Sequence, residues 1–326
     1  MYEQWKKAVV NLECATDSEH MYDASRRMDE LHSKFMKGEL SEDEVRRQLS
    51  SKTRNDIRTR GTALFISHND KKYLLTARHV VFDEYSAHKE IEEEKRRIAE
   101  NPQMNSSITH ALAMERALRS IFKTIFRVPS LDEVISRKNG ARRFLRHLSA
   151  GAPGGLPYTF SPPELDLAII SLNQNETGFA NELIGLGYKP ISTDLFSEGP
   201  TSEGAEVFTV GFPGGTSVVE GLTQTGMESE WTSHVCSLPV FTWGKVAMSH
   251  ENLFFYWCDM SIYPGNSGGP VIENGKLVGV VSAQAVIPLD EEYNLRMRIP
   301  FGKVIKAKYI KQLIDEQEIK DRHHIL

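Results

Sequence analysis

A histidine, an aspartate and a serine each stand beside a short apolar run of this chain. His79 follows such a run, Asp166 directly precedes Leu-Ala-Ile-Ile, and Ser267 lies within Gly265-Asn-Ser-Gly-Gly. A serine hydroxyl is a poor nucleophile at neutral pH unless an imidazole takes its proton. A carboxylate then holds that imidazole in the required tautomer. These residue types, in this order, predict acyl transfer with Ser267 as nucleophile, His79 as base and Asp166 as its partner.

Each of the three residues also has a purely structural interpretation. His79 could be a core histidine, Asp166 a turn cap, and Ser267 a turn residue among glycines. Two other acids, Glu164 and Asp194, lie near Asp166 in the sequence, but neither directly precedes the Leu-Ala-Ile-Ile run. Three such segments in one order favour catalysis over these structural interpretations.

The segments that carry these residues belong to a series of short apolar stretches separated by turn residues. This pattern favours a mainly β fold, arranged as a sandwich or barrel. We expect strands at 8–13, 61–66, 72–77, 166–172, 206–211, 253–258, 269–273, 276–285 and 295–300. A helix over about 303–318 is expected to close the chain, because apolar residues recur there at helical spacing.

Two charged segments, 20–58 and 84–158, interrupt the strand pattern and are predicted to be helical insertions. In the first, Gly38 stands where a helix would end, and Ser41 with Glu44 forms a capping-box pattern that opens a second helix. The second insertion carries another such pattern, Ser130 with Glu133. Its apolar residues at helical spacing are Ala111, Leu118, Ile121, Phe122 and Ile125.

The composition excludes several classes of protein. A formal net charge of −5 over 326 residues gives no concentrated basic surface for nucleic acid. No apolar run is long enough to span a membrane, and the N-terminus is too polar for a secretory signal, so we expect a cytoplasmic protein. Cys14, Cys236 and Cys258 are odd in number and widely spaced, which argues against a disulfide framework. Their irregular spacing from His234 and His250 argues against zinc, so no metal or cofactor is expected.

Several motifs together resemble the chymotrypsin-fold serine peptidases, closest to the HtrA/Deg-like branch. They include Gly61-Thr-Ala-Leu-Phe-Ile, Val207-Phe-Thr-Val-Gly-Phe-Pro, Thr242-Trp-Gly-Lys-Val and Asp259-Met-Ser-Ile-Tyr-Pro-Gly-Asn-Ser-Gly-Gly-Pro. The resemblance covers roughly 8–14, 59–83 and 159–316 and omits both insertions. It implies one protease domain over 1–326, built from two six-stranded antiparallel β-barrels with the site between them.

The resemblance also implies roles for residues around the triad. Gly265 and Ser267 would supply the oxyanion-hole N–H groups, and Ser282 would lie beside the substrate and near Asp166. Ala283 and Gln284 would form the wall that pairs with substrate backbone. Ser261, six residues before the nucleophile, would form the base of the primary pocket. Because it is small and uncharged, we expect cleavage after small or medium, uncharged residues.

Three departures from the family pattern bear on regulation. Asn266 replaces the aspartate of zymogen-type trypsins, so activation by a newly cleaved N-terminus is not expected. Val80 replaces the cysteine that follows the histidine in secreted members. Only 59 residues follow Ser267, too few for the remaining strands and a C-terminal PDZ domain.

The sequence therefore predicts a serine endopeptidase that acts on protein or peptide substrates and is regulated by its insertions or by a protein partner bound there. A vestigial protease fold that serves as a partner-binding scaffold is the main alternative, although an intact triad argues against it. Esterase chemistry is a third hypothesis, since the same site can support it.

Overall fold

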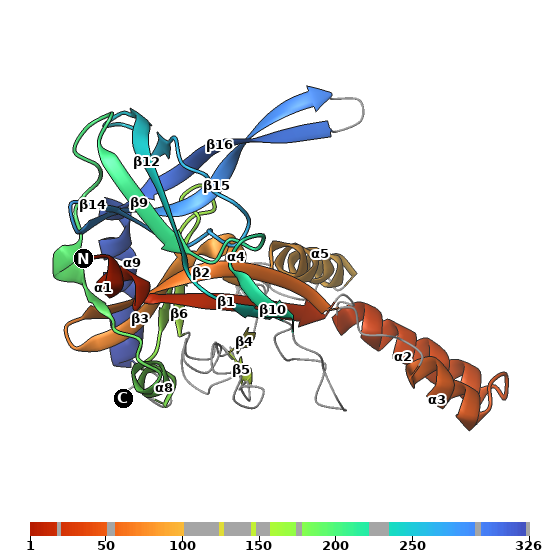
Figure 1. Cartoon of the computed structure of the whole chain (residues 1–326). Coiled ribbons are helices and arrows are strands. Elements are labelled where there is room, and N and C mark those ends of the chain that lie inside the picture. Colours follow the sequence, from red (N-terminus) through yellow and green to blue (C-terminus); the bar gives the residue numbers. More distant parts are fainter. Residues whose placement is uncertain are drawn as a thin grey trace.

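Antiparallel strands dominate the computed structural model of this chain, which confirms the prediction of a mainly β fold (Figure 1). Most of the strands fall into two six-stranded sheets. The structure describes residues 1–17, 21–50, 56–100, 124–126, 145–147, 157–173, 178–221, 235–290 and 295–323.

The first sheet has the strand order β1-β2-β3-β7-β6, with β8 paired to β2. Its strands are β1 (Val9–Asp17), β2 (Asp56–His68), β3 (Lys71–Ala77), β6 (Tyr158–Phe160), β7 (Leu167–Ser171) and β8 (Ile191–Ser192). Within the described residues this sheet is not closed, so the predicted first barrel is present only as a six-stranded sheet.

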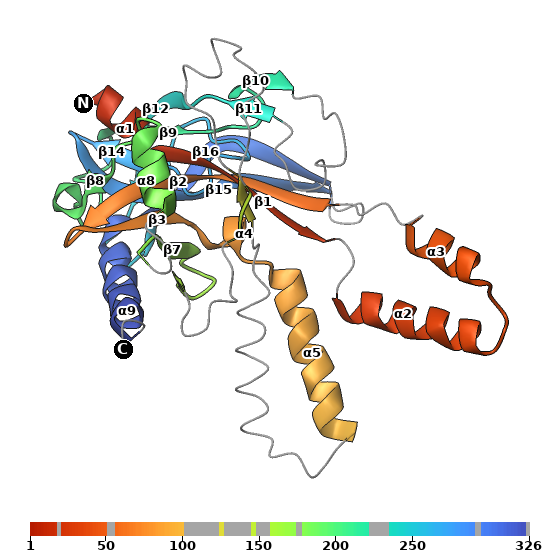
Figure 2. The same cartoon turned by 90° about the horizontal axis from the view of Figure 1, so that it is seen from below.

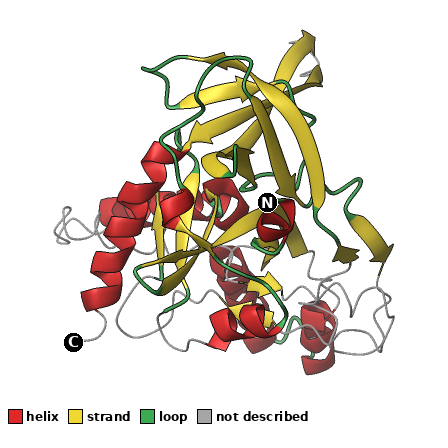
Figure 3. Ribbon diagram, turned by 60° about the vertical axis from the view of Figure 1, so that its left-hand side comes forward, coloured by secondary structure: helices red, strands yellow, loops and turns green. Residues whose placement is uncertain are grey.

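The second sheet is a closed barrel in the order β12-β13-β16-β15-β14-β9, which confirms one of the two predicted barrels. The barrel forms the strand-rich upper part of Figure 3. Its strands are β9 (Glu206–Gly211), β12 (Val240–Ser249), β13 (Phe255–Cys258), β14 (Pro270–Glu273), β15 (Lys276–Asp290) and β16 (Leu295–Lys306). The smaller described elements are α1 (Tyr2–Lys6), α8 (Gly178–Gly185), η1 (Thr193–Leu195), β10 (Val218–Gly221), β11 (Val235–Ser237) and η2 (Ala307–Tyr309).

Strand β7 shows why the chain needs uninterrupted apolar runs at its centre. All five of its residues are buried. Leu167 and Ile169 enter the core between the two sheets, whereas Ala168 and Ile170 pack inside the first sheet. Successive side chains of a strand point to opposite faces, so a strand that is covered on both faces is apolar at nearly every position. The exception in β7 is Ser171 at its end, whose hydroxyl donates to Asp321.

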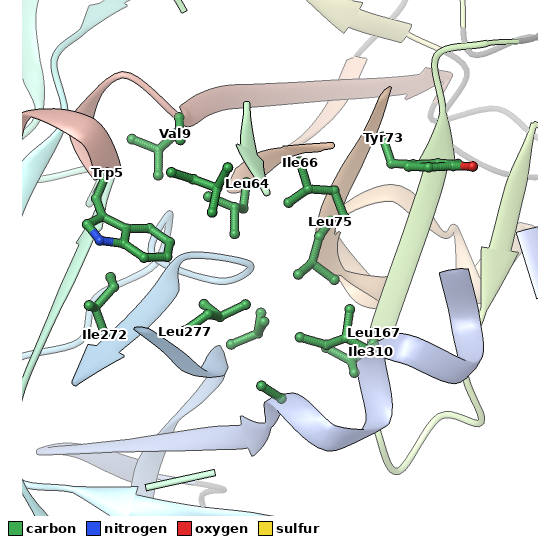
Figure 4. Packing of buried hydrophobic residues seen from close by; sticks show 14 of the residues in the cluster. Trp5, Val9, Leu64, Ile66, Tyr73, Leu75, Leu167, Ile272, Leu277 and Ile310 are labelled. Carbon is green, nitrogen blue, oxygen red and sulfur yellow. The ribbon is translucent and has the colours of Figure 1, made fainter. Parts of the chain in front are cut away.

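The core between the sheets joins them through residues from both halves of the chain (Figure 4). Trp5, Leu64 and Leu75 come from the N-terminal part, and Ile272 and Leu277 come from the barrel. Burial of each large apolar side chain contributes about 1.5–3 kcal/mol. This shared core fixes the position of one sheet relative to the other.

The first insertion lies at the tip of the long ribbon that β1 and β2 form, with pairing from Val9 opposite Leu64 to Asp17 opposite Asp56. It contains α2 (Met21–Met36) and α3 (Glu42–Ser50), which extend away from the sheets (Figure 2). Gly38, with φ +73°, follows α2, and the Ser41 and Glu44 side chains accept each other's backbone N–H. Both the expected helix end and the expected capping box are present.

The second insertion begins with α5 (Glu84–Glu100) and also contains two short paired strands, β4 (Thr124–Phe126) and β5 (Leu145–His147). Ile125, expected on a helix, lies in β4. The Ser130 and Glu133 capping box, and the positions from Ala111 to Phe122, lie outside the described residues.

The closing helix begins later than its apolar spacing predicts. Residues 303–306 belong to β16, and the helix α9 spans Ile310–His323. Lys303 pairs with Trp257 in the barrel, so ladder hydrogen bonds override the helical spacing there. No helix in the described ranges is both long enough and apolar enough to cross a membrane.

Candidate active site

His79 is placed by the junction between β3 and the short helix α4 (Arg78–Val81). Its ring Nδ1 lies 2.8 Å from Asp166 Oδ2, and its backbone N–H donates to Asp166 Oδ1 at 3.0 Å. The two contacts fix both the backbone and the ring against one carboxylate. The His79 side chain is nevertheless 45% exposed, which leaves its other face accessible.

Asp166 reaches His79 because β7 pairs with β3. Ala77 is opposite Leu167 in the last pair of β3 and β7. The next residues, Arg78 and Asp166, therefore meet where the two strands end. The Arg78 N–H donates to the Asp166 carbonyl at 3.0 Å. Asp166 has φ +49°, a left-handed conformation that aspartate tolerates better than most residues. Its side chain is 15% exposed and therefore mostly shielded from solvent.

Ser282 connects the carboxylate to the nucleophile. Its hydroxyl donates to Asp166 Oδ2 at 2.7 Å, and its carbonyl accepts a hydrogen bond from Ser267 Oγ at 3.3 Å. Within the described residues, the Ser267 hydroxyl bonds to this carbonyl and not to the His79 ring. The hydroxyl must therefore give up this hydrogen bond before its proton can pass to the imidazole.

The loop that carries Ser267 exposes two backbone donors. Among the described residues, the N–H groups of Gly265 and Ser267 have no hydrogen-bond partner. Gly265 has φ +103°, and a Cβ there would overlap the carbonyl oxygen of Phe212. Gly268 has φ +85°, and a Cβ there would overlap the carbonyl oxygen of Thr62. Only glycine fits these two positions, which is why the nucleophile lies among glycines.

Thr62, on β2, holds this loop from behind, a role that sequence reasoning missed. Its N–H donates to the Ser267 carbonyl at 2.8 Å, and its Oγ1 donates to the Gly265 carbonyl at 2.7 Å. The same hydroxyl accepts the Phe212 N–H at 3.0 Å. With both loop carbonyls bonded to Thr62, their peptide planes are fixed. The sequence assigns Thr62 only to a framework strand, because the partners of its side chain lie about 150 and 200 residues away in the chain.

The residues expected to contact substrate lie on β15 and in the loop that precedes β14. Ser261 is exposed in the loop between β13 and β14, and Ala283 is exposed on β15. Gln284 is different, because its Nε2 donates to the Ile299 carbonyl on β16 at 3.1 Å. Its side chain thus joins β15 to β16.

Of the cysteines whose side chains are described, neither Cys14 nor Cys258 is hydrogen-bonded to His79, Asp166 or Ser267. Cys14 and Cys258 are free and buried, and burial raises the pKa of the Cys14 thiol and raises that of Cys258 to about 12. A buried thiol with a raised pKa is a poor nucleophile. In the parts of the chain that are described, no three His, Cys, Asp or Glu side chains come together to hold a metal ion. His234 lies outside those parts.

Comparison with known proteins gives matches of several kinds. The family model for the trypsin-like peptidase domain matches residues 61–280. Serine protease PepD of Mycobacterium tuberculosis is 34% identical over 131 residues, which make up 40% of this chain and 26% of that protein. The match therefore spans about a quarter of that relative's length.

Two solved structures are also similar to this chain. One is Rv3671c from M. tuberculosis, crystallised as an inactive serine-to-alanine mutant, with 16% identity and a TM-score of 0.36 over 80% of this chain and 82% of the other. The other is human heparin binding protein, with 11% identity and a TM-score of 0.39 over 78% and 84%.

Proposed function

We propose that this chain, which belongs to the trypsin-like peptidase domain family, is an endopeptidase that cleaves protein substrates with Ser267, His79 and Asp166. At the family level, the resemblance expected from the sequence is confirmed, and serine peptidase chemistry follows from it. The observation that supports the proposed triad is a chain of hydrogen bonds, in which Ser282 joins Ser267 to Asp166 and Asp166 bonds to the His79 ring.

The first half of the proposed reaction forms an acyl-enzyme. The Ser267 hydroxyl turns to the His79 Nε2, gives up its proton and attacks the substrate carbonyl carbon. The carbonyl π electrons move to oxygen, and the unpartnered N–H groups of Gly265 and Ser267 stabilise that negative charge. His79 then protonates the leaving amine as the C–N bond breaks.

The second half releases the product and restores the enzyme. A water molecule gives a proton to His79 and attacks the acyl carbon, and the proton returns to Ser267 Oγ as the ester bond breaks. Throughout, the Asp166 carboxylate keeps the Nδ1 proton of His79 in place and stabilises the imidazolium. Its bond to Ser282 Oγ fixes the carboxylate itself.

We expect Thr62 to position the oxyanion loop, so Thr62→Val should lower kcat by on the order of ten- to a hundredfold with little change in KM. Valine keeps the shape but removes the bonds to the Gly265 carbonyl and from the Phe212 N–H. Thr62→Ser, which retains the hydroxyl, is the matched control. The measurement is steady-state kinetics together with affinity for a peptide aldehyde, whose adduct bears the oxyanion.

A purely structural role for Thr62 would lower thermal stability and leave aldehyde affinity unchanged relative to a matched peptide amide. Selective loss of aldehyde affinity in Thr62→Val, restored in Thr62→Ser, is the expected result. Equal losses of affinity for the two ligands would contradict the assignment.

The proposed pocket base, Ser261, carries no charge to offset the desolvation of a bound lysine or arginine. We therefore expect cleavage after small or medium, uncharged residues such as Ala, Val, Leu or Thr. The test is digestion of unfolded casein by the purified chain, with and without a fluorophosphonate, followed by mass spectrometry of the products. Cuts dominated by Lys or Arg would contradict the proposed pocket.

The same digestion separates an enzyme from a scaffold. No cleavage, together with no fluorophosphonate attached to Ser267, would favour the vestigial, partner-binding alternative. Hydrolysis of small esters without any cut in casein would favour esterase chemistry. Cytoplasmic location and a regulatory protein partner remain predictions.

One contact supports regulation through the second insertion. Its first helix, α5, begins at Glu84, whose carboxylate lies 2.9 Å from the guanidinium of Arg78. Arg78 directly precedes His79 and donates its N–H to Asp166. A partner that moves α5 would therefore act on residues next to the proposed base.

A further inference from the structure

Strand β15 is much longer than its pairing with β14 requires. The two strands pair only from Glu273 opposite Lys276 to Pro270 opposite Val280. Beyond that point, Val281 exchanges hydrogen bonds with the glycines that follow the nucleophile, as its N–H donates to Gly269 O and its carbonyl accepts from Gly268. From Ser282 to Asp290, β15 pairs with β16 alone within the described residues.

The open edge of β15 starts at the proposed nucleophile. The contacts of Val281 and the bond from Ser267 to the Ser282 carbonyl all lie on the side of β15 opposite to β16. Figure 1 shows the outer halves of β15 and β16 extending from the barrel as a two-stranded arm. An unpaired edge presents a row of free N–H and C=O groups that an extended peptide can bind as an added strand.

We propose that the β15 edge beyond Gln284 binds an extended, apolar stretch of the substrate, several residues before the scissile bond. This inference rests on the proposed peptidase function, and it extends the expected wall of Ser282 to Gln284 outward to Ile287. β15 runs away from Ser267, so an antiparallel peptide paired with it runs toward Ser267. Antiparallel pairing is the more stable arrangement, and it places the residues preceding the scissile bond on this edge.

The side chains on this arm indicate the chemistry of the substrate. Val286, Ile287 and Leu289 are between 41% and 55% exposed, and Met297, opposite Ile287 on β16, is 46% exposed. Exposed apolar side chains of this density are unusual on an otherwise solvated arm and suit apolar side chains of a bound strand. An unfolded segment with alternating apolar residues therefore fits better than a charged one.

Pro288 sets the outer limit of this edge. Proline has no N–H and is tolerated in a strand where that group is not needed for the ladder. Pro288, which is opposite Arg296 in the β15–β16 pairing, has no N–H to offer to an added strand, so we take it as the outer limit of the binding edge. From Ser282 to Ile287, at about 3.3 Å per residue, the edge accommodates about six substrate residues.

The occupant is inferred from continuity with the nucleophile. The same edge could instead pair with β15 of a second copy, because open edges also promote self-association. A second copy would explain the apolar side chains but not why the edge begins at Ser267. The substrate explains both, and the experiment below separates the two occupants.

Binding to the Ser267→Ala protein tests the inference without requiring turnover. Fluorescent peptides share one scissile sequence and carry three, seven or eleven residues before it, with valine or leucine at alternate positions. We expect affinity to rise by on the order of tenfold from three to seven residues and then level off. Lengthening on the carboxyl side should have no comparable effect, and N-methylation of backbone amides in the added residues should abolish the gain.

The matched variants locate the effect on β15. A triple variant carries Val286→Thr, Ile287→Thr and Leu289→Thr, which retain β propensity but remove the apolar surface. The ratio of its affinity for the seven-residue peptide to its affinity for the three-residue peptide should fall toward one. Ile319→Thr, an equally exposed isoleucine on α9, should keep the wild-type ratio. Thermal denaturation of each variant confirms that it is folded.

An affinity independent of amino-side length would overturn the inference, as would a ratio unchanged by the triple substitution. So would a concentration-dependent dimer that the triple substitution dissociates while no length dependence is present. A failure of wild-type protein to react with a fluorophosphonate would overturn the proposed function alone. Length-dependent binding on β15 would then still support the binding edge.

Discussion

Replacing Ser267 with alanine is expected to lower kcat by on the order of a million-fold, and His79→Ala should lower it by about as much. Without the hydroxyl no acyl-enzyme forms, and without the imidazole nothing accepts the proton. The double variant should be no slower than either single variant, because the two groups act as one unit. The measurement is single-turnover cleavage of a fluorogenic peptide at saturating enzyme.

Stability should hardly change in Ser267→Ala. The hydroxyl makes one hydrogen bond, at 3.3 Å, to the Ser282 carbonyl, and the Gly265 and Ser267 backbone remains anchored on Thr62. Ser249→Ala, on strand β12, is the matched control for loss of a serine elsewhere and should retain full activity. Cleavage by purified, folded Ser267→Ala at more than a thousandth of the wild-type rate would refute Ser267 as nucleophile.

The sequence singles out the proposed triad because several local signals coincide at each of its residues. His79, Asp166 and Ser267 each stand where an apolar run ends, and such runs become strands with their ends in loops. Burial of both faces of β7 makes its run of four apolar residues, Leu167 to Ile170, easy to recognise. Gly265 and Gly268 are equally readable, because positive φ leaves little choice of residue.

Features that depend on distant partners could not be predicted in the same way. The role of Thr62 depends on Gly265 and Phe212, which no local pattern connects to it. Residues 303–306 have helical spacing but take strand geometry, because β13 and β15 offer hydrogen bonds on both sides. The side chain of Gln284 was assigned to the wall from its position alone, and its bond to Ile299 depends on a bulge in β16.

The length of the β15–β16 arm lies between these cases. The sequence predicts a strand over 276–285. The observed strand, β15, continues for five more residues, to Asp290. The segment 286–289 includes Pro288, which usually argues against a strand interior. Only the three-dimensional pairing shows that this proline lies on a strand with one open edge.

Asp166→Asn is expected to lower kcat by about ten thousand-fold and to leave the fold intact. The carboxylate accepts three hydrogen bonds, from the His79 ring, the His79 backbone N–H and the Ser282 hydroxyl. Asparagine retains one acceptor oxygen, which can keep the backbone bond, but presents an NH₂ group to the ring. The ring must then accept at Nδ1, so its proton moves to Nε2 and His79 can no longer act as a base toward Ser267.

The backbone makes asparagine the informative substitution at position 166. Asparagine adopts the observed φ of +49° readily, whereas Asp166→Ala combines the loss of the acceptor with strain in the left-handed region. Thermal denaturation should therefore show Asp166→Asn near the wild type and Asp166→Ala below it. Ser282→Ala, which removes one bond to the carboxylate but keeps its charge, should cost far less activity than Asp166→Asn. An Asp166→Asn enzyme within tenfold of the wild-type kcat would mean that another acid, such as Asp194, orients His79.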